Sequence, residues 1–256
     1  MPRLLRNLIG LAGFFLLWEG AVQTGLVRRE FIPPPSVVLS SLAELLGDVS
    51  FLRDVIATML AWLIALGIAV VVAIPAGLLL GSIPPLQVAT RAIVEFLRPI
   101  PPVALIPLVI LIVGGGPEAK ITLAVYASVW PILFNTVYAM AEIDPVLTET
   151  AKSFGTSKSR MLTSVALPHA APFVFTGIRM SAAIALIVIV STEFVAGASR
   201  GIGNFVLEAS EGGGRRDLVL AGTVVAGIIG YLINEGLERT GRRLFAWSEV
   251  RTEVVK

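Results

Sequence analysis

The chain has 256 residues, of which 55% are hydrophobic and only 15% charged, and its formal net charge is +2. Since about a quarter of the residues of a soluble domain are charged, this composition indicates an integral membrane protein, and the small net charge argues against a nucleic-acid partner. The absence of cysteine excludes a disulfide framework, thiolate metal ligands and a cysteine nucleophile.

The N-terminal region predicts one membrane span followed by a segment in water. Arg3 and Arg6 precede an apolar run from Leu8 to Val22, which is long and lacks a clean small-x-small cleavage site. These features favour an uncleaved span over a signal peptide. Residues 25–57 are charged, and FIPPPSVVLSSLAELL within them predicts a turn and then a surface helix. We therefore expect residues 1–57 to form the first span and an extracytoplasmic segment.

Five more apolar stretches follow, each near the ~20 residues that cross the hydrocarbon core. They predict spans at about 58–81, 93–114, 119–140, 172–196 and 217–237. Prolines inside three of them are compatible with membrane helices, because neighbouring groups can satisfy the freed backbone. The sequence thus predicts an all-α integral membrane protein with six transmembrane helices, a core over residues 58–247 and a tail of residues 248–256.

The distribution of cations predicts the orientation of these spans. With the N-terminus inside, the inner segments carry Arg3, Arg6, Arg91, Lys152, Lys158, Arg160, Arg239, Arg242, Arg243, Arg251 and Lys256. The outer segments carry Arg28, Arg29, Arg53, Lys120, Arg200, Arg215 and Arg216. Arg98 and Arg179 add to the inner excess. We therefore expect both termini, and the polar loop of residues 141–171, to be cytoplasmic.

That loop contains the longest polar interruption of the apolar sequence, Glu149–Pro168 (ETAKSFGTSKSRMLTSVALP). Asp144 is placed to cap a short helix whose first residue is Pro145. Gly155 is placed to end it, since glycine accepts the left-handed conformation common at helix C-termini. Ser157 is placed to cap a second short helix.

The same segment resembles the signature loop of the permease subunits of ABC-type importers, which reads Glu-Ala-Ala, three residues, Gly, nine residues, Ile, any residue, Leu-Pro. Glu149, Ala151, Gly155, Leu167 and Pro168 stand at matching positions. Two positions depart from the pattern, with Thr150 in place of Ala and Val165 in place of Ile. The alternative is an ordinary amphipathic connector between spans.

The resemblance implies that this loop docks on a separate ATPase subunit. The residues it assigns to that coupling are Glu149, Thr150, Ala151, Phe154, Gly155, Leu167 and Pro168. The phosphate-binding pattern GxxxxGK[ST] is absent from the chain, which agrees with a separate nucleotide-binding partner. ATP and Mg²⁺ would then belong to that partner, and this chain would hold no cofactor of its own and no metal.

Further segments resemble the permeases for nitrate, sulfonate, taurine and related small solutes. They are FIPPPSVV, FLRPIPPVALIPLVILIVGGG, EFVAGASRGIGNFVLEA and RRDLVLAG, so the resemblance spans roughly residues 31–247. It implies a permease in the cytoplasmic membrane of a bacterium or archaeon, working with a second permease subunit, expected to be an identical copy, and an extracytoplasmic solute-binding protein. A permease for amino acids or metal chelates is the alternative within the family.

Two charged residues at span ends are candidates for the translocation pathway, because charge at membrane depth is costly and usually faces a cavity or a partner. Glu193 lies near the end of one predicted span, where a structural ion pair or a helix cap is the alternative. Arg98 either lines the inward route or extends to the interface. His169, the single histidine, is a candidate pH sensor, a helix cap or an interface contact.

Small residues four positions apart predict close helix packing. This spacing occurs at Ala73, Gly77 and Gly81, and again at Gly222, Ala226 and Gly230 near the C-terminus. The alternative explanation is the general enrichment of glycine in membrane helices.

Two other functional classes fit the sequence less well. A secondary transporter needs charges for ion coupling at mid-membrane, and almost none is found. A membrane-embedded enzyme needs clustered catalytic side chains, and the G-x-S-x-G pattern at residues 197–201 lacks a downstream histidine. We therefore expect no catalytic residues in this chain.

Overall fold

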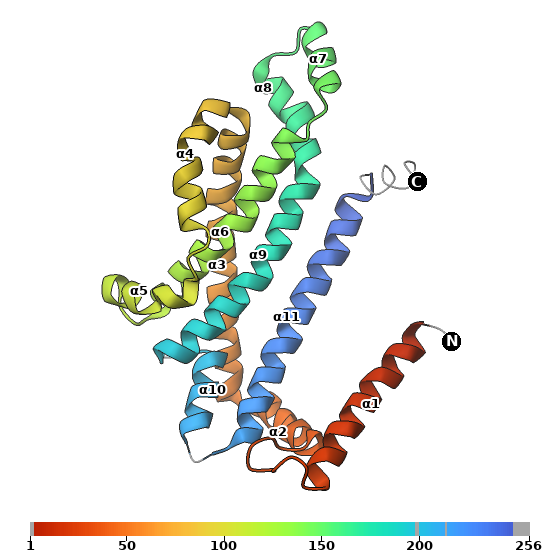
Figure 1. Cartoon of the computed structure of the whole chain (residues 1–256), viewed down its shortest axis with the longest axis vertical. Coiled ribbons are helices and arrows are strands. Elements are labelled where there is room, and N and C mark those ends of the chain that lie inside the picture. The colour runs from red at the N-terminus through yellow and green to blue at the C-terminus, as the bar shows by residue number, and fades with distance from the viewer. Residues whose placement is uncertain (1–2, 198–199, 213, 248–256) are drawn as a thin grey trace.

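A computed structural model describes residues 3–197, 200–212 and 214–247 of the chain. Within these ranges the structure is helices joined by short loops, with no strand. Figure 1 shows an elongated bundle, with α7 and α8 at one end, called here the loop end, and α2 and α10 at the other, called the far end. The predicted tail of residues 248–256 and the central Ala198 and Ser199 of the G-x-S-x-G pattern lie outside the described residues.

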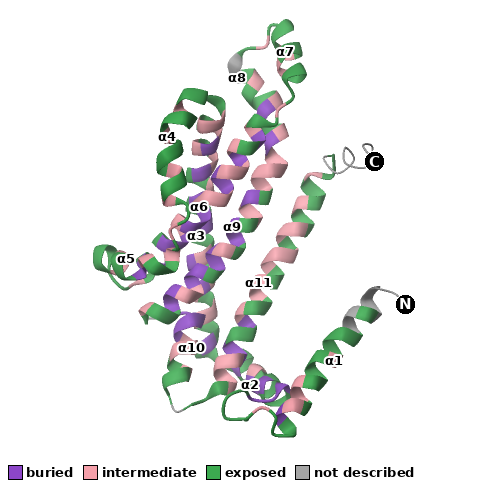
Figure 2. Cartoon of the chain, viewed as in Figure 1, coloured by how far each residue is buried: buried purple, intermediate pink, exposed green. Residues whose placement is uncertain are grey.

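Three helices form the core: α3 (Val49–Ser82), α6 (Pro117–Ala141) and α9 (Leu167–Ala196). Small side chains line their contacts, and Ala65, Ala69, Ala73, Ala124 and Ala185 are each fully buried. Figure 2 shows that the buried residues concentrate along these three helices. Without a hydrophobic driving force between helices in lipid, such small residues allow the close van der Waals contact that holds membrane helices together.

The prediction of a continuous span over residues 93–114 is wrong. The structure has α4 (Pro84–Leu97), a 3₁₀ turn η1 (Pro102–Leu105) and α5 (Ile106–Val113), and the chain bends by 78° between α4 and the η1–α5 segment. Pro99, Pro101 and Pro102 fall in the break. Each proline lacks a backbone N–H and disfavours helical geometry in the residue before it, so three within four positions end a helix even where hydropathy stays high.

Four of the other predicted spans are present with shifted ends. The predicted first span is a helix, but its apolar part, Ile9–Gln23, is shorter than the helices that are long enough to cross a membrane. Helix α3 starts at Val49 rather than near residue 58, because the Asp48 side chain caps it by accepting from the Ser50 N–H. Helix α9 starts at Leu167, directly after a π-helical turn η2 (Leu162–Ala166). Four helices, counting η2 with α9, are long and apolar enough to cross a membrane, and α4–α5 makes a fifth if the bent pair is one span. The chain is therefore a multi-pass membrane protein.

The remaining helices flank this core. α1 (Arg3–Gln23) runs out from the far end (Figure 1) and is tied to α2 (Pro35–Gly47) by Glu19, whose carboxylate accepts from Ser36. The predicted surface helix is therefore present as α2, and it packs against α11 (Arg216–Leu244). The short α10 (Ile202–Glu211) joins α9 to α11 at the far end, and α7 (Pro145–Ser153) and α8 (Lys158–Met161) form the loop end.

Candidate functional site

The polar loop forms the helix that the sequence predicts. The Asp144 side chain accepts from the Val146 N–H at 2.8 Å, and Pro145 is the first residue of α7. The helix ends at Ser153, and Gly155 two residues later has a left-handed φ of +71°. Two backbone bonds close this end, from Gly155 N–H to the Lys152 carbonyl and from Thr156 N–H to the Ala151 carbonyl. Ser157 caps α8, since its hydroxyl accepts from the Arg160 N–H at 3.4 Å. The loop is thus a defined helical hairpin.

This hairpin presents its signature residues to the outside. Phe154 is 85% exposed, and Glu149 and Thr150 are exposed on α7. A Cβ on Gly155 would meet no atom within 4 Å, so the space beside it is open. The Glu149 carboxylate has no ion-pair partner in the part of the chain that is described. An aromatic ring, a carboxylate and a glycine are therefore each accessible to another chain at this hairpin.

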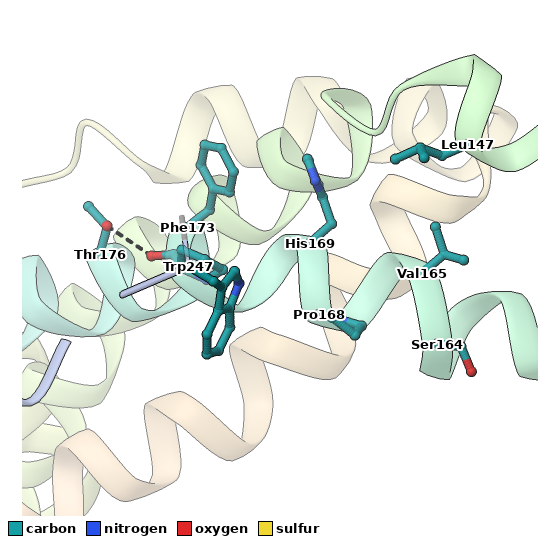
Figure 3. A pocket seen from close by; sticks show the side chains of 9 residues that line it. Leu147, Ser164, Val165, Pro168, His169, Phe173, Thr176 and Trp247 are labelled. Carbon is teal, nitrogen blue, oxygen red and sulfur yellow. Dashed lines mark hydrogen bonds between the residues drawn. The ribbon is translucent and has the colours of Figure 1, made fainter. Parts of the chain in front are cut away.

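A groove of about 690 Å³ lies at the base of the hairpin, between its end and the first turns of α9 (Figure 3). The groove is lined by Leu147 of α7, by Val165 and Trp247, and by Pro168, His169 and Phe173 of α9. The His169 and Phe173 ring centroids are 5.8 Å apart. The His169 Nε2 atom is buried without a hydrogen-bond partner among the described residues. Leu167 and Pro168, which end the signature, form the first turn of α9.

At the other end of the core, Glu193 is completely buried and forms an ion pair with Lys120. The Lys120 Nζ donates to Glu193 Oε1 at 2.6 Å and to the backbone carbonyl of Arg200 at 3.0 Å. The Thr58 hydroxyl lies 2.9 Å from both carboxylate oxygens. Lys120 lies in the first turn of α6 and Thr58 belongs to α3, so the carboxylate connects all three core helices.

Arg98, the second candidate for the pathway, is exposed at the last turn of α4, with its guanidinium carbon 4.5 Å from the centroid of the Phe134 ring. No hydrogen bond or ion pair joins it to Glu193. The structure therefore does not bring the two candidate residues together.

The predicted packing glycines lie at helix contacts. A Cβ on Gly77 would lie 2.6 Å from Thr136, and one on Gly81 would lie 2.6 Å from Met140, both on α6. On α11, a Cβ on Gly222 would approach Phe205 to 3.1 Å and one on Gly230 would approach Leu186 to 3.3 Å. Ala226 lies on the same helix and lines a small cavity with α9 and α10.

Sequence reasoning missed Lys120, which it counted among cations exposed in an outer loop. The residue stands three positions after the start of α6 and directly before an apolar run. The burial of a lysine at this position could have been predicted only if an acidic residue close to it in space had been predicted as well. Gly177, which also lies at a tight helix contact, was not singled out either.

Among the described residues there is no group of three or more histidine and acidic side chains that could hold a metal ion. What the geometry offers is a transmembrane bundle with an exposed helical hairpin at one end and a buried polar cluster at the other. Residues 69–235 match the family described as the binding-protein-dependent transport system inner membrane component.

The chain belongs to this family. It is 32% identical over 242 residues to the taurine transport system permease protein TauC of Escherichia coli, covering 93% of this chain and 87% of TauC. It is 29% identical to the bicarbonate transport system permease protein CmpB of Synechocystis, covering 91% of this chain and 86% of CmpB. The resemblance to permeases of the nitrate, sulfonate and taurine type is thereby confirmed.

Solved structures share the fold. The MetNI methionine ABC transporter matches with a TM-score of 0.66 and 23% identity, over 75% of this chain and 94% of the matched chain. A bacterial alginate ABC transporter, in complex with an alginate-bound periplasmic protein, matches with a TM-score of 0.60 and 19% identity, over 94% of each chain. The chain is therefore the permease subunit of an ABC importer, a transport component and not an enzyme.

Proposed function

We propose that this permease forms a solute pathway as a homodimer, takes solute from an extracytoplasmic binding protein, and is driven by a separate ATPase through α7. Family membership supports the permease role, and MetNI and the alginate transporter are assemblies of the same fold. The single observation that carries the coupling proposal is the capped α7 helix, which is followed by the left-handed Gly155 and exposes Glu149 and Phe154.

The proposed topology has six spans. Helix α1 is the first, the bent α4–α5 pair counts as one, and α3, α6, α9 and α11 complete the set. Figure 1 shows that the start of α1 and the end of α11 both point toward the same side of the bundle as the loop end. The greater number of cations in the segments expected on that side supports a cytoplasmic location for the loop end and both termini. The loop end would then face the compartment that holds ATP.

In this proposal the hairpin transmits the motion of the ATPase to the membrane helices as a rigid body. The ATPase halves approach each other when ATP binds, and a docked α7 would move with them. Because η2 runs directly into α9, motion of the hairpin would pass to a core helix without a flexible connection. Glu149 would meet a cation of the ATPase, and docking would desolvate both groups, so the pair would contribute more than the ~0–1 kcal/mol of an exposed ion pair.

The proposed solute is a small anion or organic solute such as nitrate, a sulfonate or taurine. TauC is named for taurine and CmpB for bicarbonate, so two relatives handle small solutes that carry an anionic group. Exposed Arg98 remains the proposed pathway residue of this chain, since its charge would attract an anion. Buried Glu193 is better assigned to the structural ion pair, the alternative weighed for it above.

Transport measurements test this function. The permease is purified with its ATPase, reconstituted in liposomes with its binding protein, and supplied with labelled taurine, nitrate, bicarbonate and an amino acid in turn. We expect uptake of one small anionic solute that requires ATP and the binding protein. Uptake driven by an ion gradient without ATP would instead show a secondary transporter. Uptake of the amino acid alone would show that the substrate belongs to the alternative class.

A further inference from the structure

The buried cluster around Glu193 also holds the start of α10. The Gly203 N–H donates to Glu193 Oε2 at 3.0 Å, and the Ile202 N–H donates to the Thr58 hydroxyl at 3.0 Å. Both N–H groups belong to the first turn of α10, which has no partner for them within the helix. One carboxylate, Glu193, therefore joins α3, α6 and α9 to the N-terminus of α10.

Two glycines make this close approach possible. A Cβ on Gly201 would overlap the Glu193 carboxyl group, and a Cβ on Gly203 would overlap the Val190 carbonyl of α9. Gly201 also has a φ of +150°, where residues with a side chain are strained. The sequence Gly201-Ile202-Gly203 is thus shaped to seat α10 directly on the carboxylate, and Ile202 between the glycines is completely buried.

Helix α10 in turn forms one wall of an apolar cavity of about 310 Å³. Ile202, Gly203 and Val206 of α10 line it, with residues of α9 on one side and Thr223 and Ala226 of α11 on the other. The position of this wall depends on how α10 is held, because α10 is only ten residues long and is joined to α9 and α11 by glycine-containing turns.

Lys120 is what allows a carboxylate to serve as this anchor. An isolated charge in such a site would be strongly unfavourable, and removing one partner of a buried pair leaves the other uncompensated. Lys120 is 3% exposed and Glu193 is 0% exposed, so water does little to replace either partner. The second bond of Lys120, to the Arg200 carbonyl, holds the turn that leads into α10.

We propose that Lys120 is a positioning residue for transport, which acts through Glu193 to fix α10 on the α3–α6–α9 core and so sets the wall of the far-end cavity. In this arrangement α3, α6, α9 and α10 move as one unit at the far end, while conformational change takes place at other contacts. The role in transport rests on the proposed function, whereas the anchoring of α10 does not.

Cysteine accessibility tests the anchor directly, because the chain has no cysteine of its own. In purified permease, Ile202→Cys places a thiol at a site that is 0% exposed, and Ser210→Cys places one at the exposed end of α10. We expect Lys120→Met to raise the rate of maleimide labelling at position 202 on the order of tenfold, because local opening of α10 becomes easier, and to leave position 210 unchanged. Equally slow labelling at position 202 in both backgrounds would overturn the anchor.

A double variant separates the ion pair from general damage. Lys120→Met with Glu193→Gln removes both charges, and the glutamine carbonyl can still accept from the Gly203 N–H. We expect this pair to return labelling to within about threefold of the parent, since no unpaired charge remains. Thr58→Val is the milder variant should Lys120→Met fail to fold, and it is expected to increase labelling by a smaller factor. Equal effects of the single and double variants would overturn the role of the pair.

Uptake per inserted molecule then tests positioning. We expect Lys120→Met to lower the maximum rate on the order of tenfold and to reduce the stimulation of ATP hydrolysis by the loaded binding protein. A purely structural role would reduce the amount of protein in the membrane but leave both quantities per molecule normal, and that result would overturn the transport part. Loss of all uptake in the unsubstituted complex would count against the proposed function alone, since the labelling result does not depend on transport.

Discussion

Gly177 of α9 lies so close to Pro131 of α6 that a Cβ on the glycine would be 2.8 Å from the proline carbonyl oxygen and 2.9 Å from the Cα of Ile132. Both neighbours are backbone atoms, which cannot move aside as a side chain can. The contact between α6 and α9, two helices of the core, therefore depends on the absence of a side chain at residue 177.

Replacement of Gly177 by valine is expected to destabilise the purified permease by about 1–3 kcal/mol, because the added atoms force the two helices apart. Thermal unfolding followed by size-exclusion chromatography measures this change. Gly227→Ala on α11 is the control, since nothing lies within 4 Å of its Cβ position, and it is expected to be neutral or to stabilise by up to ~1 kcal/mol. Equal melting temperatures for Gly177→Val and the parent would contradict the tight contact.

The coupling hairpin is tested by Gly155→Asp and Glu149→Lys. Aspartate at a φ of +71° costs backbone energy and fills the open space beside α7, and lysine reverses the charge offered to the ATPase. We expect both variants to insert normally but to lose at least ~90% of uptake, corresponding to more than about 1.4 kcal/mol of lost interaction. Subunit retention on purification, ATP hydrolysis and uptake are measured together.

Glu30→Lys is the matched control for charge reversal, because Glu30 is exposed and lies away from the hairpin, before α2. It is expected to retain ATPase binding. Gly155→Ala should lose less activity than Gly155→Asp, since it carries the backbone cost with a smaller side chain. Normal uptake and a firmly bound ATPase in both hairpin variants would show that this loop does not couple the subunits.

The orientation is tested with single cysteines at Ser157 and Ser210, both of which are exposed and lie at opposite ends of the bundle. In intact cells, a membrane-impermeant maleimide is expected to label the cysteine at 210 and not the one at 157, and a permeant reagent is expected to label both. Labelling of position 157 by the impermeant reagent would reverse the proposed topology.

His169 is expected to serve as a packing residue beside Phe173. Its Nε2 atom is buried without a partner among the described residues, and such an unsatisfied group costs roughly 1–3 kcal/mol. His169→Phe keeps the ring beside Phe173 and removes that group, so the melting temperature should not fall and uptake between pH 5 and pH 8 should keep its profile. A pH dependence that disappears in the variant would restore the sensor hypothesis.

The sequence by itself determined the helical class, most span positions and the helical hairpin at the loop end. These features depend on short-range properties: apolar runs of sufficient length, Asp144 before Pro145 at one end of α7, and a glycine at position 155 that can adopt a left-handed backbone. The break between α4 and α5 has a local cause as well, and the cluster of Pro99, Pro101 and Pro102 could have predicted it had proline been weighed above hydropathy.

Only the tertiary structure decided the environment of Glu193. Its partners Lys120 and Thr58 are 73 and 135 residues away in the chain. The residues next to Glu193 in the sequence give no indication of these partners. Whether a charge at the end of a span lines a pathway or lies in a closed ion pair depends on which helices cross there and how closely they pack. Glycines at positions such as 177 and 203 set that packing through contacts with distant backbone, which no local pattern specifies.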